Sequence, residues 1–143
     1  MTTGEALDLI GGLIASVKTF SAKLPAVVHL SVVPGGMKPT PEAVASYEQT
    51  LSRFRSQVGA TPYRKLTDLL LESLEAFEAG KVLGAVQPLL AILDQLEQMR
   101  GDKEIAVTQK DEKQMQEYRA ALHRILPGNK PELEEEAKRL KKP

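Results

Sequence analysis

The 143-residue chain contains no cysteine and no tryptophan, and only three tyrosines and three phenylalanines. Without cysteine it can form no disulfide, no thiolate nucleophile and no zinc or iron–sulfur site with cysteine ligands. Net charge is also absent, because 19 Lys and Arg balance 19 Asp and Glu. Zero net charge argues against a protein whose whole surface binds nucleic acid, although a local basic patch can still be present.

Long apolar runs are lacking as well. The most apolar stretch near the N-terminus, residues 6–17, contains Asp8 and follows Glu5, whereas a secretory signal begins with a basic region. Neither this stretch nor residues 24–34 reaches the roughly 20 apolar residues that a membrane-spanning helix needs. We therefore expect a soluble cytoplasmic protein with no membrane partner.

The length and composition are those of an ordinary globular domain, with 42% hydrophobic and 27% charged residues. Apolar residues recur three or four positions apart in six segments, which is the spacing of one face of an α-helix. This pattern predicts an all-α bundle of five or six helices with short connections. We expect the bundle to occupy residues 1–128, followed by a short charged helix or tail over residues 129–143.

Local signals mark where several of these helices begin. Threonine–proline pairs at residues 40–41 and 61–62 place threonine at the N-cap and proline in the first turn. Thr2 with Glu5 forms a capping box that predicts a further helix start. Thr108 with Asp111, also three residues apart, predicts another.

Two places interrupt the helical pattern. Pro88 lies in the fourth segment, where it removes a backbone hydrogen bond at a cost of about 3 kcal/mol, so we expect regular helix to begin near Gln87. Residues 26–33 are rich in β-branched side chains, and residues 104–108 also have an extended pattern. These two segments either pair as a small two-stranded β ribbon or serve as extended linkers.

The first helical segment is apolar on more than one side. In a monomer, such a helix has to be central and covered all round. The competing arrangement, which we expect here, has one side in the core and the other in contact with a protein partner or a second copy. The predicted contact residues, in which paired glycines allow another helix to approach closely, are Ile10, Gly11, Gly12, Leu13, Ile14 and Val17.

Basic residues gather in two stretches that contain no acid. They are Arg53, Arg55, Arg64 and Lys65 in the first stretch, and Arg119 and Arg124 in the second. If folding brings these side chains together, they form a patch that attracts phosphate groups. The alternative function is therefore a small helical subunit of a nucleic-acid-bound complex.

Groups suited to catalysis or metal binding are few. His29 lies in an apolar run, and His123 follows Arg119 by one helical turn, so neither has the carboxylate or histidine neighbour of a common metal site. We expect no metal and no cofactor.

An acidic face on the third segment is formed by Asp68, Glu72, Glu75 and Glu78. A general acid needs an isolated, poorly solvated carboxylate, so this face is either simply solvated or docks a basic partner. We expect no enzyme, and predict a non-enzymatic adaptor or scaffold that acts through protein–protein contacts.

Overall fold

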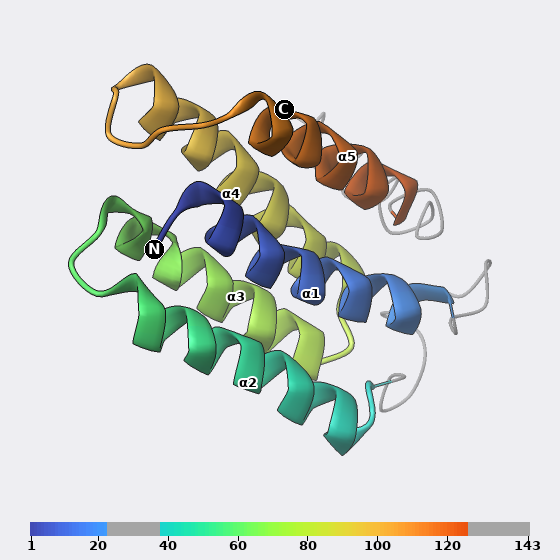
Figure 1. Cartoon of the computed structure of the whole chain (residues 1–143). Helices are drawn as coiled ribbons and strands as arrows, with labels where there is room; N and C mark the ends of the chain where they lie inside the picture. Colours follow the sequence, from blue (N-terminus) through green and yellow to red (C-terminus); the bar gives the residue numbers. More distant parts are fainter. Residues whose placement is uncertain (23–37, 126–143) are drawn as a thin grey trace, which may run out of the picture.

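The computed structural model describes residues 1–22 and 38–125 of the chain. In this part it contains five α-helices, one short 3-10 helix and no strand, which confirms the predicted all-α bundle (Figure 1). The elements are α1 (Thr3–Ala22), α2 (Pro41–Val58), η1 (Pro62–Leu66), α3 (Thr67–Glu78), α4 (Val82–Gly101) and α5 (Gln109–Ile125). The sixth predicted segment and the tail over residues 129–143 lie outside the described residues.

Three of the predicted helix starts are confirmed by their hydrogen bonds. The backbone N–H of Glu5 donates to the Thr2 hydroxyl over 3.1 Å, and the N–H of Thr2 donates back to the Glu5 carboxylate over 2.9 Å. Thr108 and Asp111 exchange the same two bonds, each 3.1 Å long. The hydroxyl of Thr40 accepts an N–H from the first turn of α2. These bonds satisfy donors that every helix start leaves without a partner.

The start predicted at residues 61–62 differs in detail. Pro62–Leu66 forms a 3-10 helix that continues into α3, and the Thr61 side chain makes no capping bond. Instead, the hydroxyl and the backbone N–H of Thr61 both donate to the carbonyl of Val58, over 2.6 and 3.1 Å. The corner between α2 and η1 is therefore closed by two bonds to one oxygen.

The prediction that regular helix begins near Gln87 is wrong, because α4 begins at Val82 and Pro88 lies inside it. Pro88 has no N–H for the carbonyl of Gly84, four residues earlier, and its ring crowds that carbonyl. Packing explains why the helix forms nevertheless. The buried residues of this first part of α4 are Val82, Leu83, Ala85, Val86 and Pro88, and their apolar burial outweighs the local cost of one proline.

The extended segment predicted at residues 104–108 is an irregular connection between α4 and α5, not a strand. Its position is set by Thr3, whose hydroxyl donates to the Ala106 carbonyl over 2.7 Å. The connection is thus anchored on the start of α1. The other half of the predicted ribbon, residues 26–33, lies outside the described residues.

α1 lies at the centre of the bundle and packs against α2, α4 and α5, while α3 packs most extensively against α4 (Figure 1). Phe77 of α3 stacks on Tyr47 of α2, with ring centroids 4.5 Å apart, and meets the edge of Phe20 of α1 at 5.8 Å. The bundle therefore has one continuous core. Among the described helices, none combines the length and apolarity needed to cross a bilayer.

A buried chain of two hydrogen bonds crosses the same core. Ser73 of α3 is fully buried, and its hydroxyl donates to the Ala85 carbonyl of α4 over 2.8 Å. The hydroxyl of Tyr47 bonds to the Ser73 oxygen, so the tyrosine is the donor in that pair. Burial raises the pKa of Tyr47 to about 12. These two hydrogen bonds link α2, α3 and α4.

Candidate functional site

The apolar contact residues predicted on α1 are covered by the chain itself. Ile10, Leu13, Ile14 and Val17 are all buried, with at most 4% of any of them exposed. These four side chains therefore form no exposed apolar face, because α2, α4 and α5 supply enough apolar surface to enclose them. α1 adopts the central arrangement instead, and these four side chains offer no surface to a partner in the folded chain.

The two adjacent glycines of α1 have different surroundings. A Cβ atom placed on Gly11 would lie 2.2 Å from the hydroxyl oxygen of Tyr118 on α5. At Gly12, which is exposed, the nearest atom would be a methyl of Thr50 at 4.0 Å. Gly11 thus permits close approach of a helix, as predicted, but that helix belongs to the same chain.

Of the six predicted basic residues, several are occupied by contacts of their own. Lys65 forms an ion pair with Glu104 over 2.7 Å, and Arg119 forms one with Asp94 over 2.9 Å. The side chain of Arg124 donates to a carbonyl of its own helix. These three cations are therefore not presented together as one free patch.

Two of the six, Arg55 and Arg64, line the same hollow of about 480 Å³ at the corner between α2 and α3. The rest of its lining consists of Val58, Gly59, Thr67 and Asp68. Both arginines are exposed, and neither forms an ion pair within the described part of the chain. Arg53 does not line this hollow, because residues two positions apart lie on different sides of a helix.

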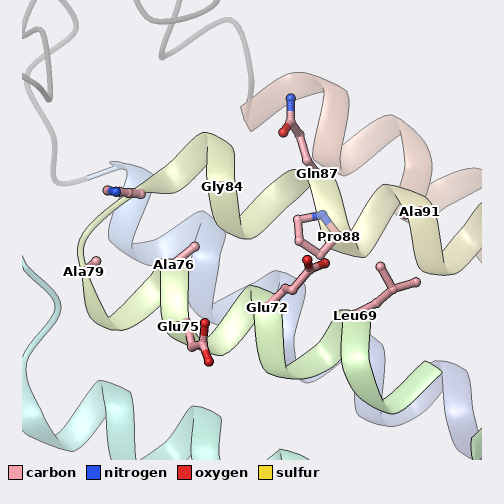
Figure 2. Close-up of a pocket in the computed structure, with 10 residues that line it drawn as sticks. Leu69, Glu72, Glu75, Ala76, Ala79, Gly84, Gln87, Pro88 and Ala91 are labelled. Carbon is pink, nitrogen blue, oxygen red and sulfur yellow. The ribbon is translucent and has the colours of Figure 1, made fainter. Parts of the chain in front are cut away.

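A second hollow, of about 560 Å³, runs between the outer faces of α3 and α4 (Figure 2). Its floor is made of small or compact residues, namely Ala76, Ala79, Gly84, Pro88 and Ala91, with Leu69 at one end. The two helices approach closely here, since a Cβ atom on Gly84 would lie 3.0 Å from that of Ala76. The small side chains leave a shallow open groove, which we call the α3–α4 groove.

Polar side chains border the α3–α4 groove. Glu72 and Glu75 come from α3, Gln87 comes from α4, and Lys81 is the residue just before α4. Figure 2 shows Glu72 reaching toward Pro88, whereas Glu75 and Gln87 point outward on opposite sides. Within the described residues neither carboxylate forms an ion pair. The rim therefore carries two unneutralised negative charges and one positive charge.

Acidity continues from this rim onto α2. The pKa of Glu78 is raised, first by its hydrogen bond to Glu48, then by burial and by the repulsion of Glu48 and Glu75. A raised pKa means that the carboxylates of this face destabilise one another's charged forms. The acidic face predicted on α3 is thus larger than expected, because α2 contributes to it.

The groove floor was not predicted, although its pattern is present in the sequence. Gly84, Pro88 and Ala91 are spaced 4-3, as are helical residues that share a face. A helix that begins only near Gln87, as the sequence analysis predicts, leaves Gly84 outside the helix and hides this pattern on α4.

The described residues contain no group of three or more side chains that could hold a metal ion. Of the two histidines, His123 is exposed on α5 and His29 lies outside the described residues. Comparisons with protein-family models, curated proteins and solved structures find no match to this chain.

Proposed function

We propose that this chain is a non-enzymatic interaction protein that binds a basic, amphipathic helix of a partner protein in the α3–α4 groove. The observation that carries the proposal is the combination of an apolar floor of small residues with two exposed carboxylates that lack an ion-pair partner within the described chain. A groove of this kind suits an amphipathic helix that inserts side chains spaced three and four residues apart.

The floor and the rim make separate contributions to such a complex. Small residues such as Ala76 and Gly84 leave room for larger apolar side chains, whose burial supplies most of the affinity. Lysine or arginine on the partner would face Glu72 and Glu75, which favours the correct partner and speeds association. Lys81 sets one boundary of the site, since it disfavours a partner cation at that end.

The charge of the groove argues for a different protein, rather than a second copy, as the partner. In a twofold-symmetric dimer the same patch occurs on both sides of the interface. Two copies joined groove to groove would bring Glu72 and Glu75 of each chain against those of the other, and like charges repel. We therefore expect light scattering to report a monomer across a range of protein concentrations.

Open, solvated carboxylates also support a binding role over catalysis. The ionisable residues that line the groove are Glu72, Glu75 and Lys81, and all three are exposed. A catalytic carboxylic acid is normally isolated in a poorly solvated pocket that tunes its pKa. Solvent-exposed charged side chains such as these are better suited to binding an oppositely charged partner than to transferring protons.

Two synthetic helical peptides test the proposal. They share one leucine stripe and differ in having lysine or glutamate on the polar face. Titration of the ¹⁵N-labelled full chain with the lysine peptide should give saturable amide shifts confined to α3 and α4. The glutamate peptide should bind more weakly, because its carboxylates meet those of the rim.

Charge-matched variants sharpen the test. Glu72→Lys should weaken binding of the lysine peptide by about tenfold. Glu117→Lys, on the exposed side of α5 and away from the groove, changes the net charge equally and should leave affinity almost unchanged. Equal weakening by both variants, or equal binding of both peptides, would contradict the proposal.

A further inference from the structure

The corner between α2 and α3 carries a feature that the α3–α4 groove does not use. We propose that the Arg55–Arg64 hollow binds the phosphate group of a small phosphorylated sugar. Its two arginines come from different elements, α2 and η1, and yet line one hollow of about 480 Å³. Neither has a carboxylate partner among the described residues. This inference is independent of the groove and of its partner.

The chemistry of the lining defines the ligand. A guanidinium group has coplanar N–H donors that can form two parallel hydrogen bonds to a phosphate group. Two guanidinium groups can therefore bind different oxygens of the same phosphate. The hydroxyl of Thr67 is a further possible donor to the same group. Asp68 repels a phosphate, but its carboxylate accepts hydrogen bonds from hydroxyl groups. A phosphate ester that also carries hydroxyls uses all four residues.

Asp68 forms no ion pair with either arginine of the hollow in the free protein. It lines the hollow together with Arg64, and an ion pair between the two would reduce the charge offered to an anion. The structure contains no such pair, nor one between Asp68 and Arg55. Both guanidinium groups are thus left available to an anion.

The backbone beneath the two arginines is held in place. Thr61 donates two hydrogen bonds to the Val58 carbonyl, which closes the corner. The hydroxyl groups of Tyr63 and Thr3 lie 2.5 Å apart and anchor η1 on α1. Val58 and Leu66 are buried on either side of the corner. A scaffold that is already ordered spends less free energy on binding.

The same geometry favours a small ligand over a nucleic-acid strand. Binding along a polynucleotide backbone needs a series of cations that each neutralise a phosphate. Lys65 and Arg119 are already paired with Glu104 and Asp94, and Arg53 does not line the hollow. A local pair of arginines is left, which suits one phosphate group.

Methyl phosphate and ribose 5-phosphate are the matched probes, because both are phosphate monoesters and only the second carries hydroxyls. Side-chain Nε–Hε signals of the full chain are followed by NMR during titration at low ionic strength. We expect the signals of Arg55 and Arg64 to saturate with one shared dissociation constant, lower for ribose 5-phosphate. Arg53, which is exposed on α2 like Arg55, serves as the internal control, and its Nε–Hε signal should barely shift. Added salt should weaken binding.

Variants separate the roles of the lining residues. Arg64→Gln and Arg55→Gln should each weaken binding about tenfold, and Arg53→Gln should not. Asp68→Asn should strengthen binding of methyl phosphate and reduce the preference for ribose 5-phosphate, because the amide oxygen is a weaker acceptor than a carboxylate. Circular dichroism confirms that each variant is folded, which is expected because all four side chains are exposed.

Three results would overturn the inference. The first is a response of Arg53 equal to that of Arg55, which would indicate general screening. The second is a pair of unrelated dissociation constants for Arg55 and Arg64. The third is tighter binding of a single-stranded oligonucleotide with shifts that include Arg119 and Arg124, which would instead favour an extended nucleic-acid surface.

Discussion

Replacing Gly11 by alanine tests how closely α5 packs on α1. Helix propensity alone predicts that glycine to alanine inside a helix stabilises by about 1 kcal/mol. The new Cβ atom, however, would lie 2.2 Å from the hydroxyl oxygen of Tyr118 and 2.8 Å from the ring carbon that bears it. The ring must then move, and overpacking of this kind costs about 1–3 kcal/mol. We therefore expect Gly11→Ala to lower the free energy of unfolding by about 1 kcal/mol net.

Gly12 provides the matched control one residue away. Its added Cβ atom would have no neighbour closer than 4.0 Å, so the helix-propensity gain should appear in full. Gly12→Ala should then raise the free energy of unfolding by about 1 kcal/mol, which separates the two variants by about 2 kcal/mol. Urea unfolding followed by circular dichroism measures both, with the m-values compared to confirm one cooperative transition.

A second background isolates the contact itself. In a Tyr118→Ala chain the crowded ring is gone, so Gly11→Ala should become stabilising, as Gly12→Ala is. The reasoning would be refuted if Gly11→Ala stabilised the otherwise unchanged chain as much as Gly12→Ala does. That outcome would mean that Tyr118 does not lie over Gly11.

Three further predictions concern buried and acidic groups. Ser73→Ala should lower the free energy of unfolding by about 1–3 kcal/mol, because the Tyr47 hydroxyl and the Ala85 carbonyl lose their partner; adding Tyr47→Phe should cost less than the sum of the two changes. The pKa of Tyr47 is about 12 against an ordinary 10.0, so its stabilising contribution is present below pH 10 and is lost as the pH rises through about 12. Ultraviolet titration should show this tyrosine ionising together with unfolding, and ionisation in the folded state near pH 10 would contradict the burial argument. The raised pKa of Glu78 favours the folded state at low pH and loses that effect as the pH rises through the raised value. Glu48→Gln should shift the Glu78 pKa back toward its ordinary value in an NMR carboxyl titration.

Much of the fold was predictable because it depends on short-range interactions. The capping boxes at Thr2 and Thr108 join groups three residues apart, so neighbouring residues alone decide them. The all-α class follows from periodic apolar residues in the same way. Pro88 is the counterexample, since a local rule predicted a later start for α4 and the burial of the turn before it prevailed.

The candidate sites were less predictable. Both arginines of the corner hollow were among the predicted phosphate-binding residues, but nothing in the sequence indicated which two of the six would share a hollow. That depends on the sharp turn after Val58, where one carbonyl accepts two bonds from Thr61. The α3–α4 groove arises from how closely two helices approach, which is set at Gly84 and Ala76.

The sequence by itself determined that this chain is helical, where most of its helices begin, and that α1 is apolar on more than one side. Only the tertiary structure decided what covers α1. Apolar residues such as Ile10 and Leu13 favour burial, but their pattern is the same whether the surface that buries them belongs to another molecule or to α2, α4 and α5. Hydrophobic burial is non-directional, so the partner of an apolar face is chosen by the packing of the whole chain.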